Sequence, residues 1–186
     1  MNPTTVLDFW FGDPPGAARP EWFRKDATFD AGIRSRFGEL HAAAALRELE
    51  GWRASPEPML ALVVVLDQFS RNLYRGDPRA FAQDDHAREC ANQAIARGDD
   101  AALLPVQRQF LYLPLEHSES LADQERCLEL MLSLEAFEPT RGLTQWAVKH
   151  RDIVARFGRF PHRNAALGRA TTPEEVEFLA QPASGF

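Results

Sequence analysis

The sequence predicts an all-α protein of about eight or nine helices joined by short loops. Apolar residues recur at steps of three and four along most of the chain, which is the spacing of helices that bury one face. No segment sustains the alternation of apolar and polar residues that a half-buried strand shows. Capping residues followed by proline, and glycines at the far ends, divide the chain into individual helices.

In the first half, residues 5–11 predict a short helix docked by aromatic side chains. From Glu21 onward, apolar residues at helical spacing between positions 29 and 44 predict a longer helix, with Gly51 as its stop. Ser55 followed by Pro56 is a helix start. The segment after it, residues 59–66, is apolar on every side. Its three consecutive valines also suit a strand, but the capped start and the helical pattern that continues to Tyr74 favour a buried central helix.

In the second half, Asp77-Pro78 is expected to start a helix that ends at Gly98. Residues 103–117 predict the next helix, and Ser120 caps the one after it. Residues 143–157 predict a further helix that Gly158 closes. A short turn follows Pro161, and the capping box that begins at Thr172 opens the last helix.

Composition limits the class of protein. A chain of 186 residues, 45% hydrophobic and 26% charged, is expected to form one globular domain over residues 1–186. The net charge of −6 argues against nucleic acid as a partner. The longest apolar run is too short to cross a membrane and no signal peptide is visible, so we expect a cytoplasmic protein without a membrane partner. Cys90 and Cys127 are expected to be free buried thiols.

Several short stretches place polar and charged side chains on helices that otherwise bury their faces. Unpaired polar groups away from water cost a few kcal/mol, so such groups on several helices predict a shared polar cleft. The candidate ligand-binding residues are Asp67, Arg71, Asn72, Glu116, His117, His150, Arg159, His162, Arg163 and Asn164.

His117 and His150 both fall at core-facing positions of their helices. Each is either a buried neutral histidine with a hydrogen-bond partner or part of a cleft where a carboxylate sets its pKa. Asp67 adjoins the apolar helix and needs a partner, for which Arg71, one helical turn later, is the obvious residue. That pair is either a structural clamp or a ligand contact.

Residues 156–169 contain several arginines and no acidic residue, which reverses the local sign of charge in an acidic protein. They either bind an anion or pair with the protein's own surplus carboxylates. The sequence contains no zinc-ligand spacing, no phosphate-binding loop and no nucleophile elbow. No metal or cofactor is therefore predicted.

Three motifs resemble a known family: Asp-Gln-Phe-Ser-Arg-Asn-Leu-Tyr-Arg-Gly at 67–76, Leu-Pro-Leu-Glu-His-Ser-Glu at 113–119 and Arg-Phe-Gly-Arg-Phe-Pro-His-Arg-Asn at 156–164. Together they resemble the bacterial family known as domain of unknown function 924, and the likeness covers essentially the whole chain. The resemblance implies a tetratricopeptide-like α-α superhelix and carries over no catalytic residues. The family often has proline in place of Ser70 and phenylalanine in place of Leu115.

The polar stretches favour the first of three interpretations of function and leave the other two as alternatives. The first is a helical-repeat protein that binds a small anionic ligand, or an acidic peptide or protein partner, in a cleft lined by arginine and histidine. The second is a cofactor-independent enzyme, a hydrolase or lyase, that uses a histidine–carboxylate pair. The third is a polar network that only fixes the packing of the helices. The sequence predicts neither the ligand nor the oligomeric state.

Overall fold

The computed structural model describes residues 1–181, so the last five residues of the predicted domain 1–186 lie outside the described part. Within residues 1–181 the chain is helical and contains no strand, which confirms the predicted fold class. The α-helices are α1 Pro3–Phe11, α2 Ala27–Ala45, α3 Pro56–Val63, α4 Ser70–Leu73, α5 Asp84–Arg97, α6 Pro105–Glu116, α7 Leu121–Leu132, α8 Thr144–Phe157 and α9 Pro173–Leu179.

The centre of the molecule is a helix that runs without a break from α3 into α4. A π-helical segment, Val64–Phe69, joins the two. Every residue from 59 to 66 is fully buried, and helices α1, α5 and α6 pack around this stretch. The prediction of a buried central helix is thus confirmed, and the alternative of a strand is excluded. Tyr74 ends the helix as its C-cap residue.

Aromatic side chains dock the N-terminal helix onto this core, as predicted. Trp10 and Phe11 of α1 are buried. The ring of Trp22 lies 4.7 Å from the ring of Phe110 on α6, and its indole N–H donates to the carbonyl of Trp10 at 2.8 Å. Edge-to-face contacts of this kind add specific geometry to the apolar burial.

The start of α5 differs from the prediction. Pro78 begins only a 3₁₀ turn, Pro78–Ala80, capped by the carboxylate of Asp77, which accepts from the backbone N–H of Arg79 at 2.8 Å. The chain makes a further turn before α5 begins at Asp84. Because a capped proline start fits a single 3₁₀ turn as well as an α-helix, the sequence pattern did not distinguish the two. Asp84 thereby becomes the first residue of α5.

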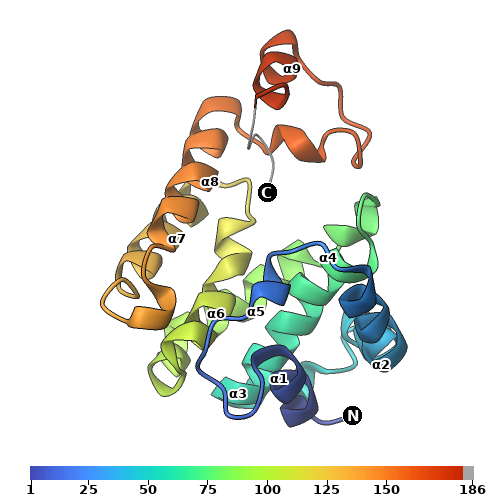
Figure 1. Ribbon diagram of the computed structural model, residues 1–186, viewed down its shortest axis with the longest axis vertical. Coiled ribbons are helices and arrows are strands. Elements are labelled where there is room, and N and C mark those ends of the chain that lie inside the picture. The colour runs from blue at the N-terminus through green and yellow to red at the C-terminus, as the bar shows by residue number, and fades with distance from the viewer. Residues whose placement is uncertain (182–186) are drawn as a thin grey trace.

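The second half of the chain is a series of neighbouring helices. α6 packs on α5, α7 on α6, and α8 on α7, an arrangement that fits a tetratricopeptide-like superhelix. Figure 1 shows α7 and α8 side by side, with α9 at the end of the molecule opposite the N-terminus. α9 contacts the 3₁₀ turn Pro161–Arg163, and a small apolar cluster around Phe160 lies beneath this segment.

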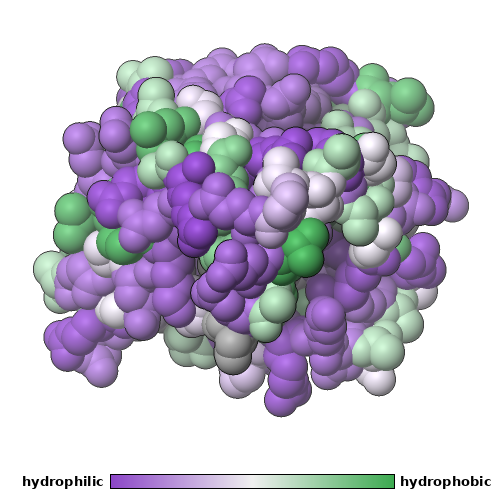
Figure 2. Space-filling view, turned by 90° about the horizontal axis from the view of Figure 1, so that it is seen from above, coloured by the Kyte–Doolittle hydropathy of each residue, from purple (hydrophilic) through white to green (hydrophobic). Residues whose placement is uncertain are grey.

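Hydrophilic residues cover most of the surface seen from above Figure 1, where hydrophobic side chains form only small separate patches (Figure 2). Among the helices described, none combines the length and the apolar character needed to cross a bilayer. Cys90 and Cys127 are both buried and free, as expected.

Candidate functional site

Asp67 and His117 form the centre of a polar cluster. Asp67 lies in the π-helical segment and is fully buried, whereas His117 is the C-cap residue of α6. Oδ1 of Asp67 lies 2.7 Å from Nδ1 of His117. Among the described residues no hydrogen bond reaches Nε2 of His117, and the side chain keeps 15% of its surface exposed. The imidazole is thus held through one nitrogen and open through the other.

A second histidine–carboxylate pair adjoins the first. Oε1 of Glu116 lies 3.3 Å from Nδ1 of His150 on α8, and the rings of His150 and His117 have centroids 6.4 Å apart. Nδ1 of His150 also lies 2.9 Å from the carbonyl oxygen of Trp146. Since a carbonyl only accepts, this nitrogen carries the hydrogen. The structure therefore brings together histidines from two different helices, each next to a carboxylate.

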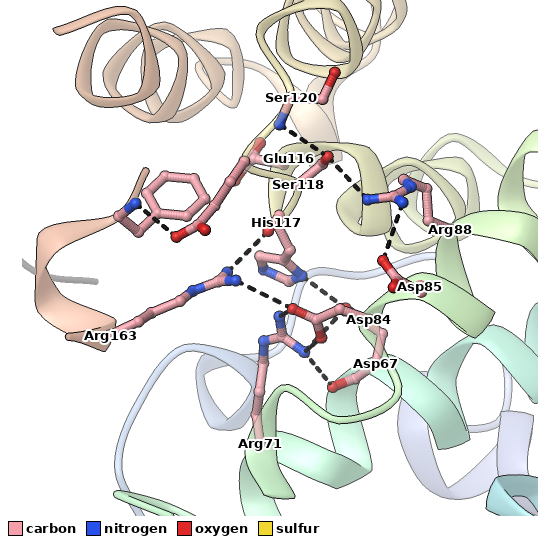
Figure 3. Close-up of polar contacts among 12 residues, drawn as sticks. Asp67, Arg71, Asp84, Asp85, Arg88, Glu116, His117, Ser118, Ser120 and Arg163 are labelled. Carbon is pink, nitrogen blue, oxygen red and sulfur yellow. Dashed lines mark hydrogen bonds and ion pairs between the residues drawn. The ribbon is translucent and has the colours of Figure 1, made fainter. Parts of the chain in front are cut away.

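Arg71 and Arg163 share the carboxylate of Asp84. Arg71 lies 3.0 Å from Oδ1 of Asp67 and binds both oxygens of Asp84, at 3.0 and 3.1 Å. Arg163 reaches Oδ2 of Asp84 at 3.2 Å and donates to the carbonyl of His117 at 2.9 Å. Figure 3 shows Arg163 extending from the C-terminal segment toward Asp84 and His117. The cluster is thus assembled from the central helix, α5, α6 and the segment after α8.

Two phenyl rings enclose the guanidinium of Arg163. Its Cζ lies 4.7 Å from the ring centroid of Phe81 and 4.7 Å from that of Phe160. Burial lowers the pKa of Arg163 to about 10, and the neighbouring charge of Arg71 acts in the same direction. A pKa in this range leaves the guanidinium charged at neutral pH, so Arg163 contributes a positive charge that contacts both aromatic rings and the carboxylate of Asp84.

The protonation states of the central pair follow from opposing effects. Burial alone would raise the pKa of Asp67, but the charge of Arg71, the charge of His117 and the hydrogen bond from His117 together hold it below its usual value. Burial and Arg71 lower the pKa of His117, and they outweigh the opposing effect of Asp67. At neutral pH the pair is therefore a carboxylate that accepts a hydrogen bond from a neutral imidazole.

The adjoining pair, Glu116 and His150, differs from the central pair in that both of its groups are uncharged. Burial raises the pKa of Glu116 to about 8, and the negative charge of Asp67 acts in the same direction. Burial lowers the pKa of His150 to about 3. Both groups are consequently uncharged near pH 7, with Glu116 as a protonated carboxylic acid. Neighbouring carboxyl groups whose environments move their pKa values apart are typical of acid–base sites.

Asn72 does not join this cluster. Its side-chain amide donates to Oδ1 of Asp30 on α2 at 2.7 Å. Neighbouring residues on a helix point about 100° apart, so Asn72 cannot face the same way as Arg71. Adjacency in the chain, which made both residues candidates for one site, does not place their side chains on one face of the helix.

Arg159 and Asn164 also lie outside the cluster. Both bind Glu175 of α9: Arg159 through two contacts of 2.6 and 2.8 Å, and Asn164 through one of 3.2 Å. Glu175 is buried and is also the acidic member of the capping box of α9, so its carboxylate needs these donors. The two residues therefore secure the last helix.

Most of the arginine-rich run pairs with the protein's own carboxylates, as one of the two interpretations predicted. Arg169 binds both oxygens of Glu119, at 2.7 and 3.0 Å, and Arg156 pairs with Glu174 at 2.9 Å.

His162 lies near the cluster. Burial, with contributions from neighbouring charges, lowers its pKa to about 4.

Asp84 belongs to the cluster but was not among the residues predicted from the sequence. An acidic residue in the first turn of a helix is ordinarily explained by the helix dipole, so the sequence gives no signal of its role. Because the helix was predicted to start at Pro78, Asp84 was not expected to lie in the first turn of α5. No group of three His, Cys, Asp or Glu side chains within residues 1–181 is arranged to hold a metal ion.

Chemically, the cluster offers a neutral imidazole with one open nitrogen, a buried protonated acid next to it, and two guanidinium groups within the same network. An imidazole held at Nδ1 by a carboxylate can accept a proton at Nε2, and the carboxylate stabilises the imidazolium that forms. The arginines can stabilise negative charge that develops nearby, although Asp84 already occupies much of their hydrogen-bonding capacity.

Comparison with known proteins places the chain in a family. Residues 6–183 match the model of the family described as bacterial protein of unknown function (DUF924). The chain is also similar to a solved structure of a protein of unknown function from Agrobacterium tumefaciens, with 45% sequence identity, a TM-score of 0.87 and 97% of each chain covered. Among curated proteins none matches the chain. The chain therefore belongs to the DUF924 family of bacterial proteins of unknown function.

Proposed function

We propose that the Asp67–His117 pair is the acid–base centre of a cofactor-independent enzyme, a hydrolase or a lyase. The observation that carries the proposal is the 2.7 Å contact between Asp67 and Nδ1 of His117, together with the absence of a hydrogen bond from any described residue to Nε2. In this role His117 takes a proton at Nε2 from water or from the substrate, and Asp67 positions the ring.

Ligand binding alone is less well supported at this cluster. A site for a free anion needs guanidinium groups with unused donors, but both Arg71 and Arg163 are bound to the carboxylate of Asp84. The two negative charges of Asp67 and Asp84 also balance the two arginines. A neutral imidazole can act as a base without a guanidinium that has unused donors, which favours acid–base catalysis over anion binding at this cluster.

A test that needs no substrate is chemical modification with diethyl pyrocarbonate at pH 7, followed by peptide mass spectrometry. Neutral imidazole nitrogens react with this reagent when solvent reaches them. We expect His117 to be modified before His41 and His86, because those two histidines are more deeply buried and each is bound through Nε2. Modification of His41 before His117 would contradict an open Nε2.

The direct test is a turnover screen with carboxylic esters, phosphate esters and hydroxy acids. Wild type, His117→Gln and the matched control His86→Gln are compared, since His86 is a buried histidine that pairs with Glu50 away from the cluster. We expect turnover by wild type and by the control, and loss of at least about 100-fold in His117→Gln. If His117→Gln lowers only the melting temperature and leaves every rate unchanged, the cluster is a structural network.

A further inference from the structure

A cavity separate from the His117 cluster lies between α2 and the end of the central helix. Its volume is about 460 Å³, within the range of small-molecule sites, and none of the cluster residues lines it. The charged lining consists of Asp30, Arg34, Arg75, Asp77 and Arg79, and the ring of Tyr74 forms part of the wall. Asn72, a predicted ligand-binding residue, lines this cavity.

The charges around the cavity do not balance. Arg75 binds both oxygens of Asp30, at 2.6 and 2.9 Å, and Arg79 binds both oxygens of Asp77, at 2.9 Å each. Arg34 has no carboxylate within ion-pair distance among the described residues. The cavity therefore carries three guanidinium groups against two carboxylates in a protein whose net charge is −6.

Arg34 retains most of its hydrogen-bonding capacity. Nη2 donates to the carbonyl of Leu73 at 2.5 Å, and this is the hydrogen bond that the guanidinium makes with the described residues. The contact fixes the side chain at the rim of the cavity and leaves Nε and Nη1 unused. A guanidinium has five N–H donors in a planar fork that matches a carboxylate or phosphate group.

The wall beside Arg34 can accept the rest of a ligand. The guanidinium of Arg79 lies 4.5 Å from the ring centroid of Tyr74, so the aromatic ring and a second cation lie next to each other. Asn72 and Arg75 both bind Asp30, which keeps that carboxylate engaged and reduces its repulsion of an incoming anion.

We infer that this cavity binds a small molecule carrying an oxyanion group, a phosphate or a carboxylate, with Arg34 as the residue that holds the oxyanion. Such a site is independent of acid–base chemistry at His117, because the two sets of lining residues do not overlap.

The test is isothermal titration calorimetry and thermal denaturation with inorganic phosphate, pyrophosphate and succinate. Wild type is compared with Arg34→Gln and with Arg126→Gln, an exposed arginine on α7 that undergoes the same change of charge far from the cavity. We expect at least one probe to bind and raise the melting temperature of wild type and of Arg126→Gln, with affinity reduced about tenfold or more in Arg34→Gln. Phosphate and succinate distinguish the two kinds of oxyanion.

If Arg34→Gln unfolds, Arg34→Lys is the variant to compare with wild type. Lysine keeps the positive charge and can still reach the Leu73 carbonyl, but it lacks the planar fork of N–H donors. We expect it to bind more weakly than wild type. Equal affinity in Arg34→Gln and wild type, or failure of all three probes to bind wild type, would overturn the inference. His117→Gln should bind the probes as wild type does, which separates failure of this inference from failure of the proposed enzyme.

Discussion

The carboxylate of Asp67 contacts Nδ1 of His117 at 2.7 Å, although the two residues are 50 positions apart in the chain. One is supplied by the central helix where its hydrogen-bonding changes to the π pattern, and the other by the end of α6. Side chains at such helix irregularities are often functional. The contact links the packing of the core to the properties of the proposed site.

Replacing Asp67 by asparagine should destabilise the protein strongly. The substitution removes a buried negative charge next to Arg71 and His117, and it leaves Arg71 with Asp84 as its remaining carboxylate. We expect the free energy of unfolding to fall by about 3 kcal/mol in urea titrations. Asp152→Asn, at an exposed pair with Arg151, should change it by less than about 0.5 kcal/mol. Similar small changes in both variants would contradict the assignment of Asp67 as a buried charge.

Glu116 should make stability fall as the pH rises from about 4.5 to about 8. Its pKa of about 8 in the folded state lies above the ordinary value of 4.5, so between these values the folded state retains a proton that the unfolded state has lost. Stability from this group is complete below pH 4.5 and declines by up to about 1.4 kcal/mol per pH unit until pH 8. Glutamine at position 116 does not titrate in this pH range. The difference in unfolding free energy between wild type and Glu116→Gln, measured from pH 5 to 8, should therefore change in favour of the variant, and a constant difference would refute the raised pKa.

His150 should contribute to acid denaturation. Its pKa of about 3 lies below the ordinary 6.5, so below pH 6.5 the unfolded state binds a proton that the folded state excludes. Stability from this group is present above pH 6.5 and is lost progressively as the pH falls toward 3. His150→Gln should show a smaller loss of unfolding free energy than wild type between pH 6.5 and 4. Equal pH dependence in the two proteins would show that His150 titrates normally.

Arg169 should control the stability of the C-terminal segment. It binds Glu119 through two contacts and also donates to the carbonyl of Phe160 at 3.0 Å. Because the pair is partly exposed, Arg169→Gln should lower global stability by no more than about 1 kcal/mol. Amide hydrogen exchange in residues 159–170 should nevertheless become faster, since Arg169 joins this segment to Glu119, which lies between α6 and α7. Arg126→Gln should leave this exchange unchanged, and protection equal to wild type in Arg169→Gln would argue against an anchoring role.

The sequence was most informative where one physical effect dominated. The apolar residues 59–66 could only be buried, and the capping box at Thr172 could only start a helix, so both features were predicted correctly. Pro78 was misleading, because the same residue types start a 3₁₀ turn and an α-helix, and the choice depends on the chain that follows.

The candidate site was predictable only in part. Asp67 and Arg71 share one helix, so their contact follows from a spacing of four residues. The contact of Asp67 with His117 and that of Arg163 with Asp84 depend on how distant helices pack, which local spacing does not encode. Asn72 illustrates the same limit, since its direction on the helix, toward Asp30, was fixed only by three-dimensional packing.

Because of the π-helical segment, the orientation of Arg71 depends more on the number of residues in 64–69 than on which apolar residues occupy these positions. A π turn holds one residue more than an α turn, and each residue of a helix rotates the following side chains by about 100°. Deleting one residue from 64–69 would let the backbone continue as an ordinary helix, but it would turn Arg71 away from Asp84. Homologues should accordingly accept exchanges among the apolar residues of this stretch while rejecting insertions and deletions.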